Sequence, residues 1–296
     1  MAPPGWSGLG ISGPNSWASR TSVWIVEALL SGSESGERVA KVRASLEEGI
    51  LCLRLNRPEA RNALDQEMVA DLIAHLEEAS VNPHVKGIVL TGTGQAFCAG
   101  ADLSRFQEEA DPRRFRWESH RLSHLVHLLE MVEKPVVAAV NGLATGLGIA
   151  LVLASDLRVA STEARFLFRE GRIGLLPSHG GIARLVRYLG LGRARDLLLG
   201  GEELDAAKAL AFGLVTEVAA SESLLEAAKH RLQKALERAP LSYGLVKRLL
   251  VLATSVDLES ALFAETLGQS QLATSEDHRE GLKALREGRK PVFRGR

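Results

Sequence analysis

The chain contains a glycine-punctuated turn, Asn141–Gly148, between an apolar run and a stretch of small apolar residues. Glycine permits backbone conformations that other residues avoid, and it lets a ligand approach the backbone closely. If a helix follows the turn, its first N–H groups have no intrahelical partner and favour negative charge. Such a turn can stabilise an oxyanion that develops on a carbonyl group. The glycine spacing equally fits an ordinary turn that packs a helix on a sheet.

A second turn of small residues, Gln95–Leu103, also follows an apolar run. Two such turns at the ends of neighbouring strands could direct two backbone N–H groups at one point. A thioester carbonyl needs this arrangement when its α-carbon loses a proton, because charge then moves onto the oxygen. Two ordinary strand-end loops remain the alternative interpretation.

The elements that would position these turns alternate between strand and helix. Val39–Leu55 is typical of strand, turn and strand, and Asp65 is a good N-cap for a helix with apolar residues at helical spacing up to Leu76. Lys86–Thr91 follows as a buried type of strand. This order predicts a parallel sheet with right-handed crossovers.

Further buried strands are predicted at Val136–Val140 and Asp156–Ala160, with a helix before the first of them that Pro135 ends. From Ile182 the pattern is helical almost to the end of the chain. We therefore expect an N-terminal extension (1–38), a core (39–195) and a helical C-terminal region (196–296). The extension has no charge before Arg20 and lacks the features of a secretory signal, so we expect it to be disordered.

The composition excludes several classes of protein. Lys+Arg and Asp+Glu are equal at 36 each, so no general field attracts nucleic acid or an anionic membrane. No apolar run is long enough to span a bilayer. The two cysteines, Cys52 and Cys98, form neither a CxxC pair nor part of a metal-binding cluster. We expect a cytoplasmic protein without a metal, a membrane anchor or a nucleic-acid partner.

Several further blocks accompany the two turns. Together with the turns they are Arg61–Leu64, Phe97–Leu103, Asn141–Gly148, Asp156–Ala160, Gly174–Pro177 with Gly180-Gly181, Ala209–Val215, Glu280–Leu282 and Pro291–Phe293. In their order and spacing these blocks resemble the crotonase superfamily, which is the enoyl-CoA hydratase/isomerase family. The resemblance covers about Val39 to Phe293 and is specific because all the blocks match together.

The resemblance implies an α/β fold with a crotonase-like ββα spiral core and a helical C-terminal region that serves oligomerisation and covers the active site. It also implies homotrimers or hexamers and acyl-CoA thioester substrates, with coenzyme A as part of the substrate and no separate cofactor. The oxyanion donors would be the backbone N–H groups of Ala101 and Leu147. Pantetheine and adenine would contact residues of two strips: Arg61, Ala63, Leu64, Ala99, Asp102 and Leu103.

The acid–base positions implied by the resemblance depart from the hydratase pattern. Hydratases of the family typically hold one water between two glutamates, but the first position is Ala150 here. The second is Glu170, which is retained, and a third position that carries Asp in some branches is Ser178. Arg169 and Arg172 could pair with Glu170 and lower its pKa.

Four histidines could suggest catalysis or metal binding. His179 follows Ser178 but has no evident acidic partner, so it is interpreted as loop structure rather than as part of a nucleophilic pair. His120, His124 and His127 recur at helical spacing and are interpreted as a polar helix face rather than a metal site. The surrounding segment, Arg114–His127, is expected to line a variable acyl pocket.

The inventory of one carboxylate and two N–H donors favours double-bond isomerisation of an enoyl-CoA, with Glu170 as the proton shuttle. Hydration with a single Glu is the alternative. Thioester hydrolysis, decarboxylation and non-catalytic acyl-CoA binding are further alternatives.

Overall fold

A computed structural model describes residues 39–102 and 111–296, in which Ala40–Arg296 form one compact unit. The predicted extension 1–38 and the predicted ligand contact at Leu103 lie outside the described residues. The boundary between the core and a helical region at 195/196 stays a prediction.

The larger sheet contains six strands in the spatial order β1-β2-β3-β5-β7-β10. β1 and β2 are antiparallel, and all other neighbours are parallel. The strands are β1 (Val42–Glu47), β2 (Ile50–Leu55), β3 (Gly87–Gly92), β5 (Val136–Val140), β7 (Leu157–Ser161) and β10 (Glu217–Ala219). The prediction of a parallel sheet that begins with a strand–turn–strand unit is confirmed.

A smaller sheet lies beside the first and has the order β4-β6-β8-β9. Its first three strands are parallel and β9 is antiparallel. The strands are β4 (Ala96–Cys98), β6 (Leu143–Thr145), β8 (Arg165–Leu167) and β9 (Leu204–Asp205). Three times the chain passes from the large sheet to the small one, as β3–β4, β5–β6 and β7–β8. This repeated passage is the expected ββα spiral.

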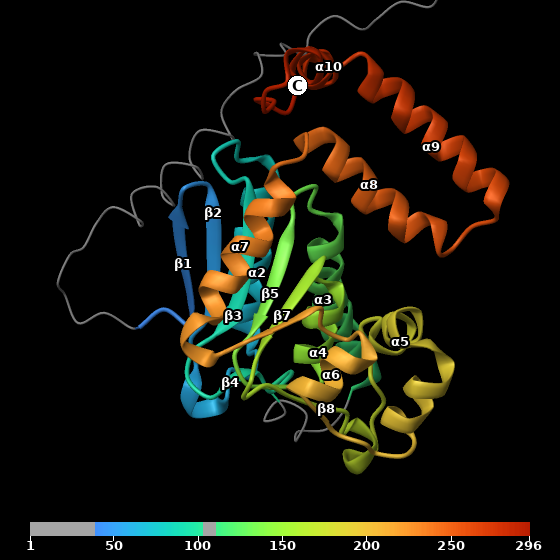
Figure 1. The fold of residues 1–296 in the computed structure, drawn as a ribbon. Coiled ribbons are helices and arrows are strands. Elements are labelled where there is room, and N and C mark those ends of the chain that lie inside the picture. Colours follow the sequence, from blue (N-terminus) through green and yellow to red (C-terminus); the bar gives the residue numbers. More distant parts are fainter. Residues whose placement is uncertain (1–38, 103–110) are drawn as a thin grey trace, which may run out of the picture. The chain divides into compact units, whose positions relative to one another are not determined.

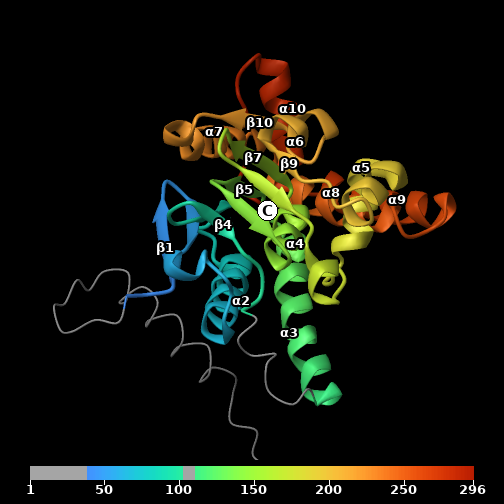
Figure 2. The same cartoon turned by 90° about the horizontal axis from the view of Figure 1, so that it is seen from below.

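Helices cover both faces of the large sheet (Figures 1 and 2). On one face, α7 (Leu224–Leu236) packs Leu224, Ala228 and Leu232 against strand residues such as Val137. On the opposite face lie α2 (Gln66–Val81), α3 (Pro112–Met131) and α4 (Leu147–Ala154), which share the main core with the smaller sheet. The predicted N-cap is confirmed, since the Asp65 carboxylate accepts a 2.9 Å hydrogen bond from Met68 N.

The remaining helices are α5 (Gly181–Leu198), α6 (Ala206–Phe212), α8 (Pro240–Ala253), α9 (Leu258–Ala273) and α10 (Glu276–Glu287), and the short 3-10 helices are η1 (Pro58–Ala60), η3 (Glu170–Ile173) and η4 (Ser221–Ser223). α8 and α9 form a helical hairpin set apart from the sheets (Figure 1). None of the helices within 39–102 and 111–296 combines the length and apolar character of a bilayer span.

Candidate active site

A cavity of about 820 Å³ lies where the two glycine-containing turns meet. Its wall includes Ala101 from the first turn and Leu147 from the second. Glu170 from η3 and part of α3 complete the arrangement, together with the loop that follows η3. Phe115, Glu118, Ser119 and Leu122 are the α3 residues on this wall, and all four fall within the segment expected to line an acyl pocket.

The two turns interlock through their glycines. A Cβ added to Gly148 would lie 2.3 Å from the carbonyl oxygen of Cys98, and one added to Gly142 would lie 2.1 Å from that of Gln95. Real Cβ atoms do not approach backbone this closely, so only glycine allows α4 to pack directly on β4. Gly146, with a φ of 57°, completes the turn that leads into α4.

Two asparagine side chains connect the turns. The buried Asn62 donates from Nδ2 to the carbonyl oxygens of Thr93 and Ala96, at 3.0 and 2.7 Å. Asn141 donates to Ala96 O at 3.1 Å and accepts from Gly92 N at 3.0 Å. Both amides therefore hold the start of β4, and they satisfy backbone groups that the irregular turns leave without strand partners.

The backbone N–H groups of Ala101 and Leu147 are both available to a ligand. Ala101 forms an isolated parallel bridge with Leu64, in which Leu64 N donates to Gly100 O and Asp102 N donates to Leu64 O. In such a bridge the N–H of the middle residue points to the other side. Leu147 is the first residue of α4, so its N–H has no intrahelical partner. Neither N–H donates a hydrogen bond to another described residue.

The side chains at and after the second donor are apolar. Leu147 is only 4% exposed and Ala150 is 2% exposed, and both belong to the main core. Ala150 does not contact the cavity, so the position of the first hydratase glutamate contributes neither a carboxylate nor a polar surface. Cys98 is fully buried nearby, and burial raises the pKa of its thiol to about 12, which keeps it protonated.

Glu170 is one of two glutamates on the cavity wall, and the other, Glu118 of α3, lies 3.3 Å from Arg114. Glu170 opens η3, its side chain is half-buried, and its Oε2 is buried without a hydrogen-bond partner among the described residues. Burial raises the pKa of this carboxyl group, although backbone N–H groups of Arg169 and Glu170 oppose the shift. A desolvated carboxylate of raised pKa is a stronger proton acceptor than a solvated one.

The expectation that arginines lower the pKa of Glu170 is wrong. Arg169 pairs instead with Glu203, to which its Nε donates at 3.1 Å and its Nη2 donates as well. The pairing lowers the pKa of Glu203 and draws the Arg169 charge away from Glu170. Arg172 does not contribute to the shift of Glu170, which burial dominates.

Ser178 and His179 also line the cavity. His179 Nδ1 lies 3.0 Å from Ser123 Oγ on α3, and the His179 backbone has a φ of 55°. Burial lowers the pKa of this imidazole, so it is neutral at pH 7. The two neighbouring residues do not form a Ser–His nucleophilic pair, because the imidazole contacts a serine from another element.

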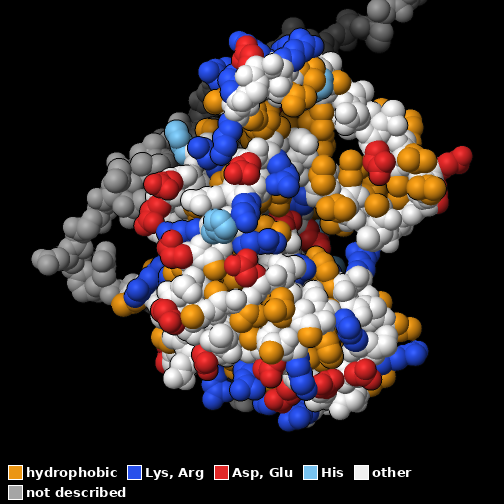
Figure 3. All heavy atoms as spheres, in the orientation of Figure 1, with side chains coloured by type: hydrophobic (Ala, Val, Ile, Leu, Met, Phe, Trp, Pro, Cys, Tyr) orange, Lys and Arg blue, Asp and Glu red, His pale blue; other side chains and the backbone are white. Residues whose placement is uncertain are grey.

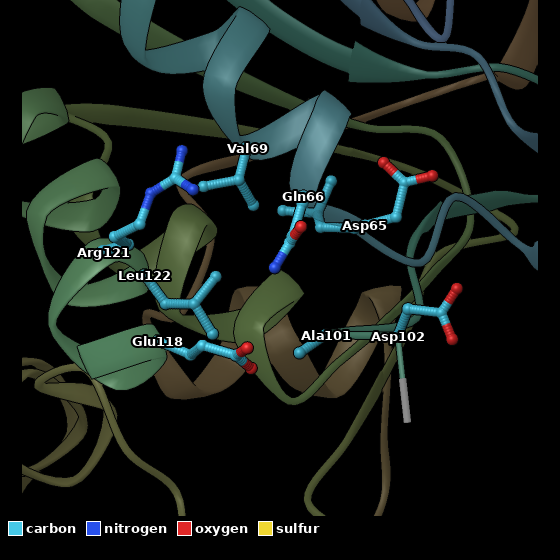
Figure 4. A pocket seen from close by; sticks show the side chains of 9 residues that line it. Asp65, Gln66, Val69, Ala101, Asp102, Glu118, Arg121 and Leu122 are labelled. Carbon is cyan, nitrogen blue, oxygen red and sulfur yellow. The ribbon is translucent and has the colours of Figure 1, made fainter. Parts of the chain in front are cut away.

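The strips expected to contact coenzyme A lie at one edge of this cavity. Arg61 and Ala99 line the large cavity, and Leu64 and Asp102 line an adjoining space of about 30 Å³. Figure 4 shows this space between the start of α2 and α3, with Gln66 pointing into it and Asp102 pointing away. The Asp102 carboxylate accepts a 2.5 Å hydrogen bond from Arg57. Ala63 borders neither space, and its carbonyl oxygen accepts from Arg57 at 3.3 Å.

The histidines on α3 lie outside the site. His120, His124 and His127 are exposed, as a polar helix face requires. His124 lies 3.7 Å from Glu77, and His127 lies 4.0 Å from Glu130. Within the described part of the chain, no group of three or more His, Cys, Asp or Glu residues could hold a metal ion.

Comparison with known proteins agrees with this architecture. A family model described as enoyl-CoA hydratase/isomerase matches residues 45–296. The chain is 35% identical over 264 residues to the 2,3-dehydroadipyl-CoA hydratase of Escherichia coli, covering 87% of this chain and all of that protein. It is 32% identical to the 1,2-epoxyphenylacetyl-CoA isomerase of the same organism, covering 86% and 98%.

A crystal structure of an enoyl-CoA hydratase from Bacillus anthracis superimposes with a TM-score of 0.82 at 30% identity, covering 87% of this chain and all of that one. The fold and the paired turns thus define an acyl-CoA enzyme of the hydratase/isomerase type. The chain belongs to the enoyl-CoA hydratase/isomerase family.

Proposed function

We propose that this protein isomerises the double bond of an enoyl-CoA thioester, with Glu170 as the only proton-transfer carboxylate. The observation that carries this proposal is the position of Glu170: its desolvated Oε2 lacks a described partner and lies on the same cavity as the Ala101 and Leu147 N–H groups. A thioester oxygen would accept from these two N–H groups, at the start of α4, where negative charge is favoured.

The proton balance of the reaction needs one carboxylate. Glu170 removes a proton from the α-carbon of a 3-enoyl thioester, and the electron pair moves through the carbonyl carbon to the oxygen held by the two N–H groups. The protonated Glu170 then returns the proton to the γ-carbon, which leaves the double bond between the α- and β-carbons. No water is consumed, and the enzyme regains its initial state.

Ala150 supports isomerisation over efficient hydration. Hydration needs a water that is held and activated as it attacks the β-carbon, and two acceptors do this better than one. At position 150 the methyl group is buried in the core and cannot orient a water molecule.

Hydration by a single glutamate is the second candidate. The observation that favours it is that relatives such as the 2,3-dehydroadipyl-CoA hydratase are named as hydratases. Glu170 alone would then activate the water and the protein would accelerate the reaction less than an enzyme with two carboxylates.

The test compares Glu170→Gln with Glu163→Gln, which removes an exposed carboxylate near the end of β7. Each variant receives 3-enoyl-CoA and 2-enoyl-CoA in water enriched in ¹⁸O, and products are identified by mass spectrometry. We expect the wild type and Glu163→Gln to form the unlabelled 2-enoyl isomer, and Glu170→Gln to lose at least about 10²-fold in kcat. Label in a hydroxyacyl product would favour hydration, label in a free acid would favour hydrolysis, and unchanged turnover by Glu170→Gln would exclude the proposal.

Coenzyme A is proposed to lie along the strips next to Ala101. Arg61 offers a cation on the cavity wall, and Leu64 and Ala99 offer small or apolar surface to pantetheine. Asp102 would act by holding Arg57, through their 2.5 Å hydrogen bond, rather than by direct contact with the negatively charged ligand.

A trimer, or a hexamer of two trimers, is proposed as the assembly. Apolar side chains gather over α8 and α9 in Figure 3, and those with large exposed fractions include Leu250, Leu258, Leu262, Phe263 and Leu267. An exposed apolar face of this kind is typical of a protein–protein contact, and a second copy of the chain is the occupant that the family resemblance implies.

A further inference from the structure

The cavity contains a polar cluster that the proposed proton shuttle does not use. It consists of Ser119 and Ser123 on α3 and of His179, which follows the loop after η3. Ile173 at the end of η3, and Leu175 and Leu176 from the loop after it, line the same cavity with apolar side chains. A few polar groups on an apolar wall commonly fix the orientation and identity of a ligand.

The imidazole ring of His179 is held at its Nδ1 edge. Nδ1 lies 3.0 Å from Ser123 Oγ, and the Ser119 backbone opposes the lowering of the ring's pKa by burial. Ser119 and Ser123 are one helical turn apart, so they reach the same edge of the ring. We assign the ring proton to Nδ1, where it is donated to Ser123 Oγ, and Nε2 then carries a lone pair.

The backbone of His179 is held as well. Its carbonyl oxygen accepts a 2.7 Å hydrogen bond from Arg184, and Arg184 forms a two-pronged ion pair with Glu130 at 2.6 and 2.5 Å. The φ of 55° is a conformation that non-glycine residues adopt rarely, although histidine tolerates it better than most. Backbone held in such a conformation beside a cavity is characteristic of functional positions.

We propose that Nε2 of His179 accepts a hydrogen bond from an O–H group inside the acyl cavity and so determines which ligands the cavity takes. The O–H group belongs either to a hydroxyl substituent on the acyl chain or to a water molecule held against it. This inference rests on the proposed function, in which the cavity receives the acyl part of the thioester. An acyl chain without an O–H group leaves the buried acceptor unpaired and therefore binds less well.

Two substitutions separate the role of Nε2 from that of the rest of the side chain. In His179→Asn the amide reaches the Nδ1 position, can still contact Ser123 and tolerates a positive φ, but has no acceptor at the place of Nε2. In His179→Gln the longer amide extends to that place. The measurement is the inhibition constant of 3-hydroxyacyl-CoA relative to that of the saturated acyl-CoA of equal chain length.

We expect the wild type to prefer the hydroxylated ligand about tenfold, His179→Asn to lose this preference, and His179→Gln to recover part of it. Equal ratios in all three proteins would overturn the proposal if a second measurement, the uptake of ¹⁸O from labelled water, is also unchanged in His179→Asn. This second measurement follows the residual hydration of 2-enoyl-CoA through the uptake of ¹⁸O from labelled water. A selective fall of uptake in His179→Asn identifies water as the source of the O–H group, and a change confined to ligand preference identifies the acyl hydroxyl.

Failure of this inference is distinguishable from failure of the proposed function. Exchange of the α-proton of an acyl-CoA with deuterium oxide reports on Glu170, and exchange above the uncatalysed rate in His179→Asn shows that this variant is folded. Glu170→Gln should abolish that exchange and keep the preference for the hydroxylated ligand. If neither the ligand ratio nor the ¹⁸O uptake depends on residue 179, His179 serves the loop only.

Discussion

Gly100 and Leu147 approach so closely that a Cβ added to Gly100 would lie 3.4 Å from the backbone nitrogen of Leu147. Gly100 directly precedes Ala101, so this contact sets the two proposed oxyanion donors, the N–H groups of Ala101 and Leu147, side by side. The φ of 102° at Gly100 is itself accessible mainly to glycine. The donors therefore depend on backbone packing rather than on the identity of their own side chains.

The Leu147 donor can be removed while the helix start is kept. Proline is favoured at the first position of a helix and has no N–H, so Leu147→Pro deletes the donor, whereas Leu147→Ala deletes only the side chain. We expect Leu147→Pro to lose about 10²–10³-fold in kcat relative to Leu147→Ala. Steady-state kinetics check this, and equal kcat values in the two variants would place the oxyanion elsewhere.

Gly148 should not tolerate even a methyl group. Its added Cβ would meet Cys98 O at 2.3 Å, so Gly148→Ala must displace α4 from β4, at a cost of at least about 1–3 kcal/mol in the free energy of unfolding. Gly192→Ala is the matched control, because Gly192 lies in α5 with nothing within 4 Å of an added Cβ, and it should stabilise by about 0.5–1 kcal/mol. Chemical denaturation measures both, and a Gly148→Ala protein as stable as the wild type would contradict the packing argument.

The ionised carboxylate of Glu170 should lower the stability of the folded protein at neutral pH. Its folded pKa is raised by burial, so the folded state binds the proton more tightly than the unfolded state, and this stabilising contribution is lost as pH rises through the folded pKa. We expect Glu170→Gln to raise Tm at pH 7 and to lose that advantage well below pH 4.5, where the wild-type carboxyl group is protonated. A Tm difference between Glu170→Gln and the wild type that grows toward low pH would contradict this prediction.

The same shift predicts the acid limb of the pH profile of kcat. Glu170 must be ionised to accept a proton, and its raised pKa moves the point of half-maximal activity above the ordinary glutamate value of 4.5. Turnover of 3-enoyl-CoA between pH 4 and pH 8 tests this. An acid limb at or below the ordinary value would argue that another group accepts the proton.

Lys247 attaches α8 to the core through a buried ion pair with Asp156, at 2.8 Å. Burial lowers the pKa of Lys247 and raises that of Asp156, and the partner opposes the shift in each case. Lys247→Met should cost about 3–5 kcal/mol in the free energy of unfolding, because it leaves a buried carboxylate unpaired. Adding Asp156→Asn should recover much of that loss.

The adjacent Arg248 provides the control for this prediction. It lies 3.7 Å from Glu133, and both side chains are largely exposed, so Arg248→Met should cost less than about 1 kcal/mol. Similar losses for Lys247→Met and Arg248→Met would show that the buried pair is not what attaches α8.

The elements that sequence reasoning found are those with strong local signals. The Asp65 cap and the strand Val136–Val140 were predicted at the positions where they occur, because capping and continuous apolar runs are local properties. The helix α3 ends at Met131, three residues before the predicted end, since its C-cap Val132 is already extended.

The smaller sheet was not predicted. β4, β6 and β8 have three residues each, and two of them lie inside segments interpreted as turns. A strand of three residues shows too few alternations to reveal its period, and its pairing depends on neighbours far along the chain. The meeting of the two turns was nevertheless predictable, because the carboxyl ends of neighbouring parallel strands lie at one edge.

The surroundings of Glu170 and His179 were not predictable for a related reason. The pairing of Arg169 with Glu203 and the contact of His179 with Ser123 join residues 34 and 56 positions apart. Sequence adjacency suggested an Arg169–Glu170 pair, which does not form, and the Ser178–His179 pair, which the sequence did not favour, does not form either. Only the folded backbone determines which of these side chains face each other.

Asn62 and Asn141 both donate to Ala96 O, and they contact the turns rather than the rest of the cavity wall. Asn62 and Asn141 hold the turns that we propose polarise a thioester, whereas residues 170, 178 and 179 belong to other elements of the cavity wall. Mutations at those three positions can therefore change which proton moves, or whether water takes part, while the two turns keep their structure. The two turns and the residues that decide the reaction outcome can therefore be altered independently by mutation.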